Sequence, residues 1–305
     1  MYEYLRVADT ILHQFGAERV VISNEADRKL KQSVLVGHQE INDSLMAHGE
    51  NDIGKWIVSS VTQLGRIWIS IAHKTLGYPI DSGFMLNKWE ILHSKLNYFT
   101  KPEKTTIKFE SRKKPYTSSV VLRDKEATFK INLFPFNYVL KDFQFGKAYA
   151  DSCFLCPVVS TYPCVITVEQ INKLSKICTA FTTSVSAEMS KLVKLIIKNK
   201  KLIAVIGGET ASSDIGTLDI CDVEYDNPDE FVIGKFPIDN FTNLKVLQKN
   251  EIPFNIGAKL DKDGTPRCPN ETLYIHDEDE TYSIGISIHA IPEQAREQAA
   301  GATIG

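Results

Sequence analysis

Four segments with apolar residues at helical spacing give the two halves of this chain the same order. They lie at 1–15, 86–99, 166–181 and 234–251, and runs with strand-like patterns follow each of them. Apolar residues that recur every three or four positions predict a helix with one buried face. Because the helix–strands–helix–strands order occurs twice, the sequence predicts an α+β protein of two similar domains, each with two helices packed on antiparallel sheet.

The length of the chain fits this division. Its 305 residues are enough for two domains of ordinary size. Clear periodicity is missing between 134 and 165, a stretch with three prolines, and the domain junction is expected there. We therefore expect one domain at 1–150, a second at 151–292 and a flexible tail at 293–305. The first domain departs from the repeat between 27 and 83, which predicts an insertion.

Local signals mark two elements of the second half. Asn199 and Lys200 separate two apolar runs and predict a tight hairpin, although they lack the glycine of the best turns. Pro237 predicts the first turn of the helix at 234–251, and Asp239 adds a negative charge near the positive end of that helix.

Composition excludes some classes of protein. Apolar residues make up 43% and charged residues 24% of the chain, as in ordinary globular proteins. No apolar run approaches the roughly 18 residues that cross a bilayer, and the start lacks a basic segment typical of signal peptides. We expect no membrane partner, a cytoplasmic location and six cysteines that remain free thiols.

The net charge of −3 does not favour nucleic acid, so any such binding would need a segregated basic face. Lysines and arginines gather at 101–114, whereas acids gather at 214–230. The candidate DNA-facing residues are the cations of the helical segments, away from their apolar stripes: Arg6, Lys88, Lys95, Lys173, Lys176, Lys245 and Lys249. Within each helix the lysines are three, four or seven residues apart and share a face. A solvated lysine face without a ligand is the alternative for any single helix.

The order and periodicity of the segments resemble the DNA sliding clamps of the T4-like phage and PCNA-like kind. The stretches that carry the resemblance are CPVVSTYPCVITVEQINKLSKIC, KLVKLIIKNKKLIAVIGG, EFVIGKFPIDNFTNLK and TYSIGISIHAI. The resemblance implies a ring-forming homotrimer of two-domain subunits whose helices surround duplex DNA. It also implies a DNA polymerase and a clamp loader as partners, in the cytoplasm of a phage-infected bacterial cell.

The sequence has no strong motif for catalysis, for phosphate binding or for a metal site. Cys153 and Cys156 have the spacing of a zinc or redox pair, but no second pair follows, which favours buried thiols. The loop at 206–214 follows an apolar run yet lacks the lysine and hydroxyl residue of a phosphate loop. The acidic run that begins at His276 could bind a cation, but an exposed turn is favoured. We therefore expect no enzyme activity, no cofactor and no metal.

The resemblance and the basic helices favour a polymerase processivity factor that encircles duplex DNA. Two alternatives stay open. A viral structural protein needs none of these charges. A single-stranded nucleic-acid binder would stack bases on the aromatic residues near the basic stretch. These residues are Tyr98, Phe99, Tyr116, Phe134, Phe136 and Tyr138.

Overall fold

The structure is a computed structural model, and it describes residues 2–17, 19–23, 56–61, 67–73, 84–86, 88–110, 119–135, 158–181, 191–207, 215–225, 229–259 and 272–291. The chain divides into two compact units. The first comprises Met1–Pro157 with His276–Ser287, and the second Val158–Ile275 with Ile288–Gly305. The expected domain boundary at 150 and the expected tail at 293–305 lie outside the described residues.

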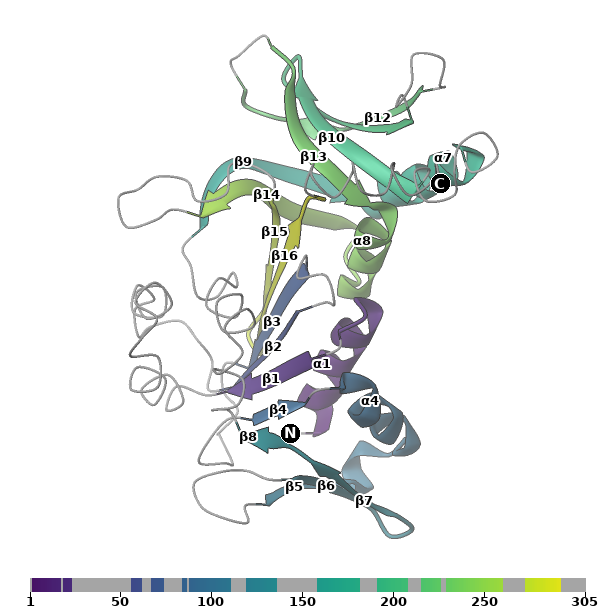
Figure 1. Cartoon of the computed structure of the whole chain (residues 1–305), viewed down its shortest axis with the longest axis vertical. Coiled ribbons are helices and arrows are strands. Elements are labelled where there is room, and N and C mark those ends of the chain that lie inside the picture. The colour runs from purple at the N-terminus through teal and green to yellow at the C-terminus, as the bar shows by residue number, and fades with distance from the viewer. Residues whose placement is uncertain are drawn as a thin grey trace, which may run out of the picture. The chain divides into compact units, whose positions relative to one another are not determined.

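In its described residues the first unit has two α-helices, a larger antiparallel sheet and a small one (Figure 1). Its elements are α1 (Tyr2–Gln14), β1 (Arg19–Ser23), β2 (Trp56–Val61), β3 (Ile67–His73), β4 (Phe84–Leu86), α4 (Trp89–Tyr98), η1 (Pro102–Lys104), β5 (Thr106–Glu110), β6 (Ser119–Arg123), β7 (Thr128–Asn132) and β8 (Phe134–Pro135). The larger sheet has the order β8-β4-β1-β2-β3-β16, where β16 is Tyr282–His289, and the small sheet has the order β5-β6-β7. Strands β2 and β3 fall inside the predicted insertion, yet they are part of the larger sheet.

Helix α1 ends where the sequence supplies a glycine. Gly16 has a φ of 64°, a left-handed conformation that glycine adopts without a Cβ clash. The Ala17 amide donates to the Leu12 carbonyl at 2.9 Å and the Gly16 amide to the His13 carbonyl at 3.0 Å. These two bonds form a Schellman motif, which satisfies carbonyls at the end of the helix.

The described residues of the second unit also have strands around two α-helices. Its elements are β9 (Val158–Thr167), α7 (Val168–Phe181), β10 (Leu192–Lys198), β11 (Lys201–Gly207), β12 (Ile215–Asp222), β13 (Phe231–Pro237), α8 (Ile238–Asn243), η3 (Leu244–Leu247), β14 (Glu251–Lys259) and the start of β15 (Thr272–Glu278). One sheet has the order β12-β11-β10-β13, and β14 pairs with both β9 and β15. The predicted α+β fold, with helices on antiparallel sheet, is confirmed.

Helix α7 begins with a capping box. The Gln170 amide donates to Thr167 Oγ1 at 3.1 Å, and the Thr167 amide donates to Gln170 Oε1 at 2.8 Å. Gln170 Nε2 also donates to the Ile220 carbonyl on β12 at 2.6 Å. One side chain therefore fixes both the start of the helix and its position on the sheet.

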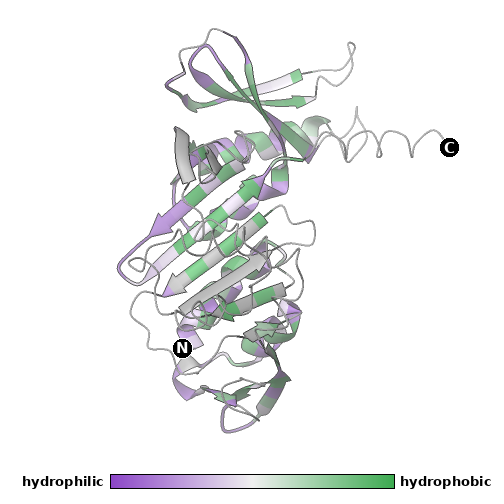
Figure 2. Ribbon diagram, turned by 60° about the vertical axis from the view of Figure 1, so that its left-hand side comes forward, coloured by the Kyte–Doolittle hydropathy of each residue, from purple (hydrophilic) through white to green (hydrophobic). Residues whose placement is uncertain are grey.

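The hairpin predicted at Asn199 and Lys200 is confirmed. Lys198 pairs with Lys201, and the two residues between them have φ values of 52° and 60°. Two consecutive positive φ values form the primed turn whose twist matches that of the flanking strands. The apolar residues of β11 are buried at every second position, whereas Leu195, Ile196 and Ile197 of β10 are buried in succession across a register shift. Figure 2 shows apolar and polar residues along the strands.

The helix predicted at 234–251 is confirmed only in part, over 238–247. Strand β13 continues to Pro237, so helix α8 has six residues and the 3-10 turn η3 follows it. Gln248 then adopts a left-handed conformation, with a φ of 55°, and the chain enters β14. Phe236 is buried in the alternating pattern of a strand, and its partner in β10 is Val193. Strand pairing therefore overrides the helical spacing of the apolar residues.

Gly234 in β13 gives a test of this packing. Its φ of 155° disfavours other residues, and a Cβ atom at this position would lie 2.5 Å from Cβ of Ala290. We expect Gly234→Ala to lower the free energy of unfolding by about 2–3 kcal/mol, from the backbone strain and the overlap together. Thermal and chemical denaturation measure the change.

The double variant Gly234→Ala/Ala290→Gly is the control, because it removes the overlap and keeps the strain. It should recover part of the lost stability. An unchanged denaturation midpoint in Gly234→Ala would contradict the packing described for β13.

Candidate nucleic-acid interface

Helices α1 and α4 of the first unit form an antiparallel pair (Figure 1). At one end, Tyr2 donates a hydrogen bond to the Leu96 carbonyl at 3.1 Å. One turn along α1, Arg6 donates to Oδ1 of Asn97 at 2.7 Å. Because residues later in α1 meet residues earlier in α4, the polar contacts between the helices follow one another along the whole pair.

A buried carboxylate lies in the middle of this pair. Asp9 is 3% exposed, and its Oδ1 accepts a hydrogen bond from Trp89 Nε1 at 2.9 Å. His93 Nδ1 lies 3.0 Å from each carboxylate oxygen. Leaving such a carboxylate without partners would be costly, so these bonds fix the position of α4 on α1. Sequence reasoning missed this cluster, because its residues are about 80 positions apart.

The helices of the second unit contact one another through a polar bond. Lys245 Nζ, on η3, donates to Oδ1 of Asn172 on α7 at 2.6 Å. The opposite face of α7 buries Ile171, Leu174 and Cys178, as the sequence predicted. Each unit therefore has helices with one face in the core and one polar face.

Two more of the predicted DNA-facing lysines have partners on the protein. Lys173 Nζ lies 2.7 Å from the carboxylate of Glu169, one turn earlier on α7. Lys95 Nζ lies 4.9 Å from the centre of the Phe129 ring. Exposed pairs of this kind contribute at most about 1 kcal/mol, so a phosphate could replace the partner at small cost.

Three of the predicted lysines are exposed near helix ends or on helix faces. Lys88 precedes α4 as its N-cap residue with extended backbone, and Lys176 lies on α7. The ammonium groups of Lys88 and Lys176 make no hydrogen bond or ion pair with any residue in the described part of the chain. Lys249 lies beyond η3, so the helix face that it was expected to share with Lys245 does not exist.

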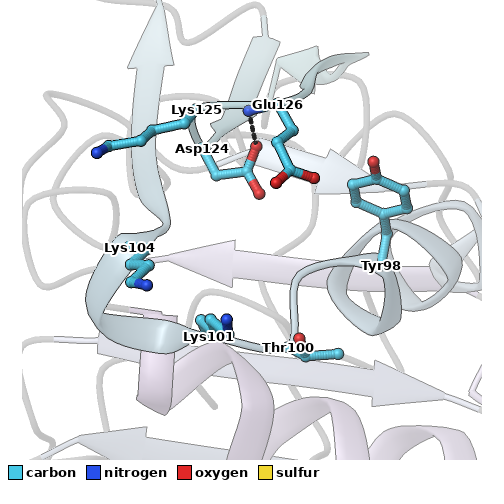
Figure 3. A pocket seen from close by; sticks show the side chains of 7 residues that line it. All are labelled: Tyr98, Thr100, Lys101, Lys104, Asp124, Lys125 and Glu126. Atoms are coloured by element: carbon cyan, nitrogen blue, oxygen red, sulfur yellow. Dashed lines mark hydrogen bonds between the residues drawn. The ribbon is translucent and has the colours of Figure 1, made fainter.

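A cavity of about 240 Å³ lies beside the C-terminal end of α4 (Figure 3). Its lining residues are Tyr98, Thr100, Lys101, Lys104, Asp124, Lys125 and Glu126. Asp124 Oδ1 accepts the amides of Glu126 and Ala127, so this carboxylate holds the β6–β7 turn. Three lysines against two carboxylates leave one net positive charge at the cavity.

The aromatic residues named for base stacking differ in exposure. Tyr98 is 52% exposed, whereas Phe99 is buried and packs against Phe129. Phe134 is half-exposed. Tyr116, Phe136 and Tyr138 lie outside the described residues. A buried ring such as Phe99 cannot stack on a base, which weakens the single-strand alternative.

Two cysteines of the second unit interact. A hydrogen bond from the Cys164 thiol lowers the pKa of Cys221 to about 7 and raises the pKa of Cys164 itself. Burial raises the pKa of Cys178 to about 11. These three cysteines are free thiols, as expected.

The other sequence motifs give no site in the described part of the chain. The pair Cys153 and Cys156 and most of the loop at 206–214 fall on residues that the structure does not describe. The run at His276 ends β15 in an exposed turn, where Asp279 Oδ1 accepts the amides of Thr281 and Tyr282. Among the described helices, none is long and apolar enough to cross a membrane.

The fold has counterparts among solved structures. No protein-family model and no curated protein matches the chain. Two structures of the Helicobacter pylori beta clamp, bound to 5-chloroisatin and to 3,4-difluorobenzamide, match 95% of the chain with TM-scores of 0.53 and 0.54 and identities of 13% and 12%. The match spans 63% of the length of that clamp. Proliferating cellular nuclear antigen from Entamoeba histolytica matches 90% of the chain over its own full length, with a TM-score of 0.45 and 11% identity.

At these identities the likeness concerns the fold alone. The chain has the α+β fold of the beta clamp, in which helices pack on antiparallel sheets.

The pKa values of the thiols give a test of the second unit. A lowered pKa means that Cys221 becomes a thiolate above about pH 7, so its alkylation rate should rise through pH 7 and level off near pH 8. Cys178 should stay unreactive over this range because its pKa is raised. Mass spectrometry of peptides after brief iodoacetamide treatment gives the rate at each cysteine.

Cys164→Ala removes the hydrogen-bond donor and is the matched control. In that variant the midpoint for Cys221 should move upward by at least about one pH unit. A midpoint near pH 9 in the unaltered protein would show that the two thiols do not interact.

Proposed function

We propose that this protein is a sliding clamp that encircles duplex DNA. The observation that carries the proposal is the beta-clamp fold over 95% of the chain. The packing of the helices supports it, because each unit buries one face of its helices and leaves a polar face with lysines. In an assembled ring these polar faces would meet the DNA backbone.

The proposed mechanism is topological and needs no catalysis. A closed ring stays on duplex DNA without tight binding, and a polymerase tethered to it gains effective concentration. Lysines that exchange weak protein partners for phosphates suit this role, because each contact is weak and independent of sequence. Two lysines could make this exchange: Lys173 would leave Glu169, and Lys95 would leave Phe129.

The finer parts of the proposal come from the resemblance to T4-like phage clamps. We propose a homotrimer of two-unit protomers, opened by a clamp loader, that tethers the replicative polymerase during phage infection of a bacterial cell. The candidate DNA-facing residues remain Arg6, Lys88, Lys95, Lys173, Lys176, Lys245 and Lys249. Lys88 and Lys176 are the strongest candidates, because their ammonium groups are exposed and make no polar contact with described residues.

The test compares two sets of charge variants. Lys88→Glu/Lys176→Glu changes the helix faces, and Lys108→Glu/Lys200→Glu makes the same charge change on β5 and in the β10–β11 turn. The protein is diluted until its subunits dissociate and is then concentrated with nicked circular duplex. Gel filtration at moderate salt measures the retained protein, and light scattering measures the mass of the oligomer.

We expect retention on circles, release when a restriction enzyme linearises the DNA, and a several-fold loss of retention only in the helix variant. The light-scattering mass should be that of a closed ring in both variants. A stable monomer at micromolar concentration, or equal retention on linear and circular DNA, would contradict the clamp. Tight binding to short single strands would instead favour the stacking alternative, with Tyr98 and Phe134 as the exposed rings.

A further inference from the structure

Three metal-ligating side chains meet at one end of the α1–α4 pair. His13 lies in the last turn of α1, and Glu90 and His93 lie three residues apart at the start of α4. One ligand atom from each residue lies within 4.8 Å of the others. His13 Nδ1 is 3.6 Å from a Glu90 carboxylate oxygen, and the two imidazole rings stack with centres 3.7 Å apart.

The donor set selects a class of metal. Two imidazole nitrogens and one carboxylate oxygen suit zinc and similar first-row transition ions, whereas calcium and magnesium take mainly oxygen ligands. We propose that His13, Glu90 and His93 form a binding site for a zinc-class divalent ion that joins α1 to α4. The site does not depend on the DNA-binding proposal, because both helices belong to one unit and no nucleic acid takes part.

His93 is already held as a metal ligand would be. Its Nδ1 lies 3.0 Å from both oxygens of buried Asp9. A carboxylate that accepts the Nδ1 proton leaves the lone pair of Nε2 for a metal and fixes the ring. Nε2 lies 2.9 Å from Nδ2 of Asn97, an exposed amide that an ion would displace. Asp9 would thus be a positioning residue behind the ligand.

The geometry requires the His13 ring to rotate out of its stacked position, because two rings at an angle of 7° cannot both direct a lone pair at one ion. Two ligand atoms on one tetrahedral zinc lie about 3.3 Å apart, given bond lengths near 2.0–2.1 Å. The present separations reach at most 4.8 Å. The side chains of His13 and Glu90 are 51% and 71% exposed, so rotations of these two can close the site while His93 stays in place. The same exposure lets the ion enter and leaves a fourth position for water.

Cobalt and zinc titrations of the full chain test the site. The background variant Cys153→Ser/Cys156→Ser removes the thiol pair, which could bind either metal. Isothermal titration should give one zinc ion per chain, and cobalt should give the visible spectrum of a low-symmetry site without a thiolate charge-transfer band. The melting temperature should rise as zinc is added, because the ion binds only the folded helix pair.

Variants of the exposed ligands separate binding from folding. His13→Asn and Glu90→Gln change exposed side chains, so both should keep the circular dichroism spectrum and lose stoichiometric binding. Asp9→Asn should weaken binding by about 10–100-fold. His276→Asn changes a histidine near the β15–β16 turn and should bind metal as the background does. Unchanged zinc affinity in His13→Asn and Glu90→Gln, or no binding in the background protein, would overturn the proposal.

Discussion

The structure depends on burying one face of each main helix while the opposite face stays in water. Leu5, Leu12 and Ala8 of α1 are almost fully buried, as are Ile171 and Leu174 of α7. Burial of a leucine or isoleucine side chain contributes roughly 1.5–3 kcal/mol, far more than an exposed ion pair. The core therefore decides which face of a helix points outward. The charges on the outer faces are free to serve a ligand because stability needs little from them.

Polar contacts then fix how each helix lies. In the first unit, Asp9 is buried between α1 and α4, and its bonds with Trp89 and His93 hold the pair at one relative position. In the second unit, Gln170 caps α7 and reaches the β12 backbone. Different polar groups thus hold the helices in the two units: a buried carboxylate in one and a capping amide in the other. The helices of both units therefore have the same spacing of apolar residues, although the polar residues that hold them differ.

The cations on the helices differ in how available they are to a ligand. Arg6 donates a hydrogen bond to Asn97, and Lys245 donates one to Asn172. Both bonds join neighbouring helical segments. Lys88 and Lys176 are exposed on the helix side of each unit. The clamp function proposed above would need contacts that form and break quickly, and cations with weak partners would satisfy this requirement better than a dense basic patch. The net charge of −3 is compatible with such a surface.

The sequence alone determined the elements whose signals are local. The spacing of apolar residues in α1 and α7 and the turn at Asn199 and Lys200 depend on neighbours within a few positions. The buried face of α7 could also be predicted, because a helix brings residues three and four apart onto one face.

Only the tertiary structure decided the rest, because the deciding contacts join distant residues. The spacing at 234–251 suits a helix, but pairing of β13 with β10 keeps residues up to Pro237 in a strand. The sequence predicted no metal site, and His13 reaches Glu90 and His93 only because α1 packs antiparallel to α4. Patterns along the chain record which face of an element is buried, whereas the partners on that face are chosen by packing between segments far apart.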